Sequence, residues 1–199
     1  DTEKFKNNKI KTLYIDPIQI LFPARIIREK GFIELFETCL ILWKEGYRFQ
    51  LNIAGEIDLE NKSTLTQNEI NDISMNKNIN FYGKVIDMKS IYSKTDIVVL
   101  PSWREGLSKS LIEAASMSLP IIATDVPGCK EIIENKQSGI LIPLKNKFLL
   151  KKAIKKLIQN PKLGINYGIK AREIVKNKFE VTHINNKILE LYKQILSIT

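Results

Sequence analysis

Short apolar runs alternate with helical patterns along most of this chain, and this alternation limits its fold more than any other feature. Each run is bounded by glycine, proline or polar residues. Runs of this kind are typical of strands buried on both faces, as in a parallel sheet covered by helices. We expect strands at Ile18–Ala24, Phe49–Ala54, Ile79–Tyr82, Ile97–Leu100, Ile121–Thr124 and Gly139–Ile142.

Helical patterns fill the segments between these runs and the C-terminal part of the chain. We expect helices at Gly31–Glu45, Met88–Lys94 (capped by Asp87), after Ser108, at Lys130–Glu134, and over 146–159, 161–178 and 180–197, with 58–76 weakly helical. The fold class that follows is α/β: a doubly wound, Rossmann-like domain with a parallel six-stranded sheet and C-terminal helices. We assign residues 1–17 to a linker, 18–178 to the domain and 179–199 to a C-terminal helix.

Composition excludes some partners. The 199 residues carry a formal net charge of +9, with 44% hydrophobic and 27% charged residues, an ordinary balance for a globular domain. No run of lysine and arginine is long enough for a nucleic-acid-binding arm, so we expect no nucleic-acid partner. The densest basic cluster, KKAIKK at 151–156, has helical spacing and fits a solvated helix face. Contact with an anionic membrane surface is the alternative interpretation.

Nucleophiles and metal ligands are scarce. Cys39 and Cys129 are the only cysteines, and His183 is the only histidine. We expect Cys39 to be a core residue, Cys129 to follow a loop, and His183 to lie on the surface of a polar helix. Nothing indicates a disulfide framework, a metal site or a cofactor. A reducing cytosol is therefore the expected location, with the inner face of the cytoplasmic membrane as the alternative.

The stretch at 96–115, DIVVLPSWREGLSKSLIEAA, holds the strongest candidate site. It is predicted to form a strand, a polar loop and a helix within about twenty residues, the unit that binds anions at the carboxyl end of a strand. Glu105 lies in the loop and Glu113 on the helix. An anionic group would lie between them, over the backbone N–H groups of Gly106 and Leu107.

The spacing of the two glutamates favours one extended ligand. Eight residues at helical rise span about 12 Å, whereas paired glycosidase carboxylates stand roughly 5–9.5 Å apart. A hexose at one carboxylate, a ribose at the other and a diphosphate between them would fill this layout, with Arg25 and Lys30 neutralising the diphosphate. Taken singly, each of these residues fits an ordinary surface or turn position, so the joint arrangement carries the interpretation.

Four segments resemble glycosyltransferase family 4 enzymes of the GT-B fold. PARIIREKG at 23–31 resembles the G-R-x-x-x-x-K-G segment, with Ala24 in place of the usual glycine and with Arg25 and Lys30 as the diphosphate-binding pair. LPSWREGLSKSLIEA at 100–114 resembles the E-x7-E motif, with Glu105 and Glu113 as its glutamates. FYGKV and PIIATDVPGCKEII also resemble the family.

The resemblance implies a retaining, metal-independent transferase that uses a nucleotide-sugar donor. It implies that Glu105 contacts the donor sugar, that Glu113 contacts the ribose, and that Gly83 and Val85 lie near the base. We therefore expect Arg25, Lys30 and Glu105 to be catalytic, and the donor to be UDP-linked. The segment EGLSKSLIEA at 105–114 most resembles the corresponding segment of bacterial enzymes that build surface polysaccharides or lipid-linked oligosaccharides.

The chain carries strands for one of the two Rossmann-like domains of such enzymes. Its first residues resemble the interdomain hinge of the family, so we expect an acceptor-binding domain upstream, and we expect the last helix to pack toward it. The leading hypothesis is a donor-binding domain that transfers little alone and acts on a glycan or lipid-linked acceptor in the whole enzyme. A nucleotide-binding subunit that needs a partner, or a sugar-nucleotide epimerase, are the alternatives.

Overall fold

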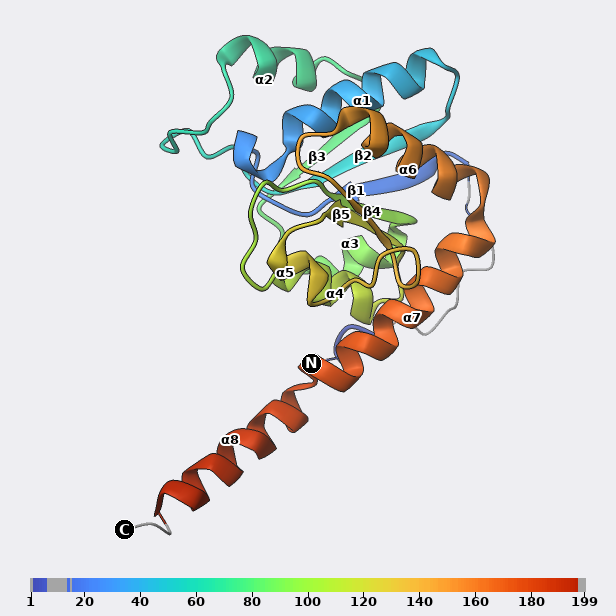
Figure 1. Ribbon diagram of the computed structural model, residues 1–199. Coiled ribbons are helices and arrows are strands. Elements are labelled where there is room, and N and C mark those ends of the chain that lie inside the picture. Colours follow the sequence, from blue (N-terminus) through green and yellow to red (C-terminus); the bar gives the residue numbers. More distant parts are fainter. Residues whose placement is uncertain (1, 7–13, 15, 197–199) are drawn as a thin grey trace.

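Six strands form one parallel sheet in the computed structural model, which describes residues 2–6, 14 and 16–196. The strand order is β3-β2-β1-β4-β5-β6 (Figure 1). The strands are β1 Ile18–Phe22, β2 Phe49–Ala54, β3 Ile79–Gly83, β4 Ile97–Leu100, β5 Ile121–Thr124 and β6 Ile140–Ile142. Since the chain runs from β1 outward to β3 and then from β4 outward to β6, the sheet is doubly wound, which confirms the predicted fold class.

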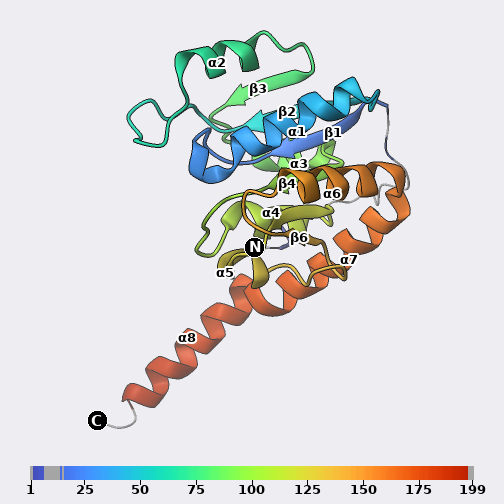
Figure 2. The same ribbon diagram turned by 45° about the horizontal axis from the view of Figure 1, so that its top comes forward.

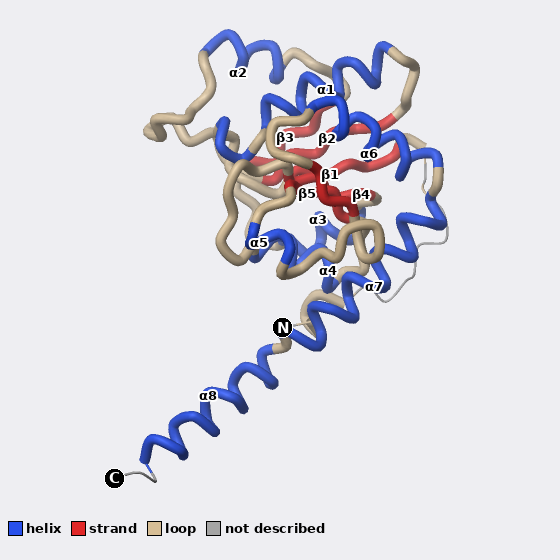
Figure 3. Tube along the Cα trace, viewed as in Figure 1, coloured by secondary structure: helices blue, strands red, loops and turns tan. Residues whose placement is uncertain are grey.

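Helices cover both faces of this sheet. They are η1 Arg28–Lys30 (a short 3-10 helix), α1 Phe32–Lys44, α2 Gln67–Ser74, α3 Met88–Lys94, α4 Lys109–Ser116, α5 Pro127–Lys130, α6 Lys147–Gln159, α7 Pro161–Phe179 and α8 Val181–Leu196. α1 and α6 pack together on one face, and α4 and α7 pack together on the other (Figure 1, Figure 2). Figure 3 shows the strands enclosed between these layers and α8 pointing away from them.

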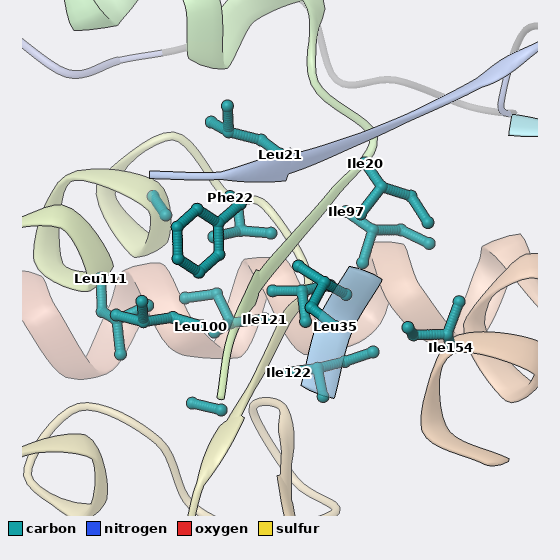
Figure 4. Close-up of a cluster of buried hydrophobic side chains, with 14 of the residues drawn as sticks. Ile20, Leu21, Phe22, Leu35, Ile97, Leu100, Leu111, Ile121, Ile122 and Ile154 are labelled. Carbon is teal, nitrogen blue, oxygen red and sulfur yellow. The ribbon is translucent and has the colours of Figure 1, made fainter. Parts of the chain in front are cut away.

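The core lies on both sides of the central strands. Figure 4 shows side chains of β1, β4 and β5 together with side chains of α1, α4 and α6. The labelled residues are each at most 1% exposed: Ile20, Leu21, Phe22, Leu35, Ile97, Leu100, Leu111, Ile121, Ile122 and Ile154. Burying one such side chain stabilises the fold by about 1.5–3 kcal/mol relative to leaving it exposed. Every residue of β4 and β5 is buried, so β4 is apolar throughout and β5 is apolar up to Thr124, whose hydroxyl donates to the carbonyl oxygen of Ser102.

The strand bounds follow the apolar runs closely. The strands at Phe49–Ala54, Ile97–Leu100 and Ile121–Thr124 are confirmed residue for residue. β1 ends at Phe22, two residues earlier than predicted, because the next residue is Pro23, which has no N–H to donate to a neighbouring strand. β3 extends one residue further than predicted, and β6 begins one residue later.

One predicted helix is wrong. We expected a loop followed by a helix at Lys130–Glu134, whereas the helix is α5, which ends at Lys130. Pro127 takes its first position, where the fixed φ of proline favours a helix and the missing N–H has no bond to lose. Ile132 and Ile133 lie beyond the helix and are 0% and 2% exposed, so their apolar character reflects burial in the core.

Capping side chains set two other helix starts. The weakly helical region over 58–76 contains only α2, which begins after Thr66. The Glu69 carboxylate accepts the Thr66 N–H at 2.7 Å, and the Thr66 hydroxyl accepts the Glu69 N–H at 3.4 Å, a reciprocal capping box. The predicted cap of α3 is confirmed, because the Asp87 carboxylate accepts the Ser90 N–H at 3.3 Å.

The predicted terminal segments are described only in part. α8 covers Val181–Leu196 of the helix expected over 180–197, and none of its residues is buried. Most of the linker predicted over 1–17 lies outside the described residues. Within the described ranges, no helix is both long and apolar enough to cross a membrane.

Glycines bring three loops at the carboxyl edge of the sheet into backbone contact. Gly31, between η1 and α1, has a φ of 71°, and a Cβ there would overlap the carbonyl group of Pro101 after β4. Gly128, in α5, lies so close to Gly106 that a Cβ would overlap the Gly106 carbonyl oxygen. The loops after β1, β4 and β5 are therefore held together by contacts that no other residue type permits.

We predict that Gly128→Ala lowers the free energy of unfolding by about 1–3 kcal/mol, because the added methyl group meets backbone atoms that cannot rotate away. Urea denaturation followed by circular dichroism measures the change. Gly106→Ala is the matched control, since a Cβ at position 106 meets no atom within 4 Å. Equal stability of the two variants would contradict the proposed loop contact.

Candidate functional site

The carboxyl edge of the sheet carries a cleft of about 800 Å³, a size typical of small-molecule sites. We call it the Glu113 cleft. Its lining includes Phe5, Pro23, Ala54, Val85, Tyr92 and Glu113. Pro23 follows β1, Ala54 ends β2, Val85 follows β3 and Glu113 lies on α4. The cleft therefore lies at the switch point between β1 and β4, where doubly wound sheets bind ligands.

Lys30 and Glu105 form an ion pair at this same edge. The Lys30 ammonium donates to the Glu105 carboxylate at 2.7 Å, and the side chains are 24% and 9% exposed. Lys30 ends η1 after β1, and Glu105 lies in the loop after β4. The structure thus brings together two predicted site residues that lie 75 positions apart in the chain.

Backbone contacts hold these two loops in place. The Trp103 N–H and the Ser102 hydroxyl both donate to the carbonyl oxygen of Glu29, at 2.8 Å and 3.1 Å. Glu29 directly precedes Lys30, so the bonds fix the β4 loop against η1. The Lys30–Glu105 ion pair is therefore held by backbone contacts between the two loops as well as by the attraction of its charges.

Arg25 has a different partner. Its guanidinium donates to the Asp58 carboxylate at 2.5 Å, with the two side chains 58% and 23% exposed. Sequence reasoning missed Asp58, although its position after β2 would have placed it at the carboxyl edge of a parallel sheet. More than half of the Arg25 side chain remains open to solvent, so it can still reach an anionic ligand.

Glu113 is a largely buried carboxylate that lines the cleft. Its side chain is 12% exposed, and it lies 3.8 Å from the ammonium of Lys109. The Tyr92 hydroxyl donates to it at 3.4 Å. Burial raises the pKa of Glu113 above its ordinary value, and the charge of Lys109 and the Tyr92 hydrogen bond offset this only in part.

The helix predicted after Ser108 is confirmed, because α4 begins at Lys109. Gly106 and Leu107 lie in the loop before it, as predicted. Ser108 is the N-cap residue but makes no side-chain capping bond. The N–H groups of the first turn of α4 thus belong to residues 109–111. Leu107 is 56% exposed.

Gly83 and Val85 are the two residues that we expected near the base. Val85 lines the Glu113 cleft, whereas Gly83 ends β3 with a φ of 60°. Sequence reasoning also missed Tyr92 and Lys109, which contact Glu113. Lys109 lies four residues before Glu113 on α4, a helical spacing that could have placed the two side chains on one face. Tyr92 comes from α3, and no spacing in the sequence relates it to Glu113.

The cysteines offer no reactive thiolate, although the charges of Glu105 and Lys30 act on Cys129, and the histidine lies on α8. Cys39 and Cys129 are buried, free thiols, and burial raises the pKa of Cys129 to about 12, which keeps it protonated. His183 lies on α8, whose residues are not buried. Among the described residues, no group of three or more histidine, cysteine, aspartate and glutamate side chains could hold a metal ion.

Comparisons with known proteins identify the domain type. A family model described as "Glycosyl transferases group 1" matches residues 3–181. The capsular polysaccharide biosynthesis glycosyltransferase CapM of Staphylococcus aureus is 28% identical over 98% of this chain and 52% of its own length. An N,N'-diacetylbacillosaminyl-diphospho-undecaprenol alpha-1,3-N-acetylgalactosaminyltransferase of Campylobacter jejuni is 30% identical over 94% of this chain and 47% of its own. The chain thus spans about half the length of these relatives.

Solved structures share the fold. Anabaena HepE in complex with UDP-glucose superposes with a TM-score of 0.82 over 98% of this chain and 55% of that protein, at 17% identity. A glycosyltransferase from Rickettsia africae gives 0.80 over 92% and 48%, at 25% identity. The separate C-terminal domain of LpcC from Francisella tularensis gives 0.74 over 91% and 98%, at 22% identity. The Rossmann-like sheet is therefore that of a GT-B structure.

Glu113→Gln is expected to raise the melting temperature near pH 7–8 and to change it little at pH 4. Burial raises the pKa of folded Glu113 above its unfolded value. At pH values between the two pKa values the native state binds more protons than the unfolded state, so wild-type stability falls as the pH rises through this range. Glutamine keeps the Tyr92 hydrogen bond and cannot ionise.

Thermal melts of both proteins between pH 4 and pH 8 measure this difference. Glu131→Gln, on an exposed residue, is the control for charge removal. A stability difference that does not grow with pH would show that the Glu113 carboxylate is not penalised by burial.

Proposed function

The chain belongs to the glycosyl transferases group 1 family, and from this premise we propose that its carboxyl edge binds a UDP-linked sugar as the donor of a retaining sugar transfer. The Lys30–Glu105 ion pair at 2.7 Å carries the proposal, because it sets a cation and a nearly buried carboxylate at the edge that holds the Glu113 cleft. Such a donor offers an anion for the cation and hydroxyl groups for the carboxylates.

In this proposal, positively charged side chains bind the diphosphate. Arg25 and Lys30 neutralise the phosphate oxygens, and backbone N–H groups at Gly106, Leu107 and the start of α4 add hydrogen bonds. When the bond between the anomeric carbon and the diphosphate oxygen breaks, its electron pair stays on that oxygen. The two cations stabilise this developing charge, the part that a divalent metal plays at many phosphate sites.

The carboxylates orient the two sugars of the donor. Glu105 accepts hydrogen bonds from hydroxyl groups of the transferred sugar, while Glu113 accepts them from the ribose. Gly83 and Val85 lie beside the base. These assignments follow the E-x7-E pattern of family 4, and the different surroundings of the two glutamates support separate roles. Glu105 has a lysine at 2.7 Å, whereas Glu113 has its lysine at 3.8 Å and a pKa raised by burial.

The acceptor belongs to the whole enzyme. An acceptor hydroxyl forms the new bond to the anomeric carbon, its proton leaves with the released UDP, and the sugar keeps its anomeric configuration. Relatives named for capsular polysaccharide and for a diphospho-undecaprenol substrate support a glycan or lipid-linked acceptor in polysaccharide biosynthesis. We expect the acceptor to be held by a second, N-terminal domain, so this chain alone binds donor without efficient transfer.

The proposal predicts that the chain binds UDP and UDP-sugars in isothermal titration calorimetry. Arg25→Ala and Lys30→Ala should each weaken binding about tenfold or more, because each removes a charge-assisted hydrogen bond to phosphate. Thermal melts of each variant separate a loss of contact from a loss of fold, which matters most for Lys30 because its removal leaves Glu105 unpaired.

Arg48→Ala is the matched control. Arg48 is 77% exposed, pairs with Asp16 at 3.1 Å, and precedes β2 at the amino edge of the sheet. Its removal lowers the net charge equally and should leave UDP affinity unchanged. Absent UDP binding by the folded wild-type chain, or equal weakening by Arg48→Ala, would overturn the proposed donor site.

A further inference from the structure

Tyr92 is a buried residue beneath the Glu113 cleft that the donor-binding roles above leave unused. Its side chain is 0% exposed, and its ring packs edge-on against Phe5 with centroids 6.2 Å apart. Phe5 and Glu113 both line the cleft. Tyr92 therefore joins the N-terminal segment to the carboxylate at the cleft floor.

The Tyr92 hydroxyl has two acceptors on α4. It donates to the carbonyl oxygen of Ser110 at 2.9 Å and to the Glu113 carboxylate at 3.4 Å. Ser110 lies in the first turn of α4, three residues before Glu113. The one proton of this hydroxyl is therefore shared between the backbone of that turn and the carboxylate, with the shorter contact to the backbone. Burial of the hydroxyl keeps water from replacing either contact.

We propose that Tyr92 is a positioning residue that holds the Glu113 carboxylate toward the cleft and thereby makes the site select ribonucleotides over 2′-deoxyribonucleotides. This inference rests on the proposed donor function. A nearly buried carboxylate that has lost its hydration gains most from a ligand hydroxyl and loses most when that hydroxyl is absent. Without a fixed orientation, the carboxylate turns away from the sugar and the discrimination declines.

Several charged groups surround this carboxylate. Lys109 approaches it from α4, Lys4 acts on it from the N-terminal segment, and Asp87 and Lys89 line the same cleft beside α3. Against this background, the Tyr92 bond stabilises the ionised carboxylate. Removing the hydroxyl therefore raises the pKa of Glu113. Since only the ionised carboxylate is purely an acceptor, discrimination between the two nucleotides is then lost at a higher pH.

The test compares UDP with 2′-deoxy-UDP by calorimetry on this chain. Wild type is expected to prefer UDP at least about tenfold, the effect of one hydrogen bond to a charged group. Tyr92→Phe should reduce that ratio to within about threefold, mostly through weaker UDP binding. Tyr47→Phe removes a hydroxyl that accepts from Gln159 on an exposed surface, and it should keep the wild-type ratio.

A second variant tests whether Tyr92 acts through Glu113. Glu113→Gln should lower the same ratio, and in that background Tyr92→Phe should have no further effect on it. An unchanged ratio in folded Tyr92→Phe overturns the inference, as does equal binding of both nucleotides by wild type. If wild type binds neither nucleotide, the proposed function itself fails, which is a distinguishable result.

Discussion

Close backbone contact between loops is the constraint on which the rest of this structure depends. Gly31 lies against Pro101, and Gly128 lies against Gly106, at distances that leave no room for a Cβ. These contacts draw the loops after β1, β4 and β5 into one surface at the carboxyl edge of the sheet. Because Lys30 adjoins Gly31, and Glu105 adjoins Gly106, the same contacts bring the ion pair together.

The two glutamates of the site show how one helix-and-loop unit can hold carboxylates in different electrostatic states. Glu105 has a lysine partner at 2.7 Å, which compensates for its loss of water. Glu113 has a tyrosine hydroxyl and a more distant lysine, and burial still raises its pKa. A carboxylate whose burial is incompletely compensated by protein groups gains more from ligand hydroxyl groups than one that is already closely paired.

The strands could be predicted from the sequence because each central strand is buried on both faces. Ile97–Leu100 is apolar without interruption, and Ile121–Thr124 is apolar up to its last residue. Runs this short, bounded by proline or polar residues, favour a strand. The predicted helix at Lys130–Glu134 was wrong because Ile132 and Ile133 are core residues outside any helix. Local apolar periodicity cannot distinguish such core residues from the apolar face of a helix. The turn chemistry of Pro127 was the signal that decided the helix start.

The sequence by itself determined the sheet and its doubly wound class, since apolar periodicity and chain order are local properties. It also predicted that Arg25, Lys30, Glu105 and Glu113 belong to the carboxyl edge of that sheet. Only the tertiary structure decided which charges are paired: Lys30 with Glu105, and Arg25 with Asp58. It also revealed Tyr92 beneath Glu113. Such pairings join residues far apart in the chain, and their geometry depends on loop packing that sequence spacing does not encode.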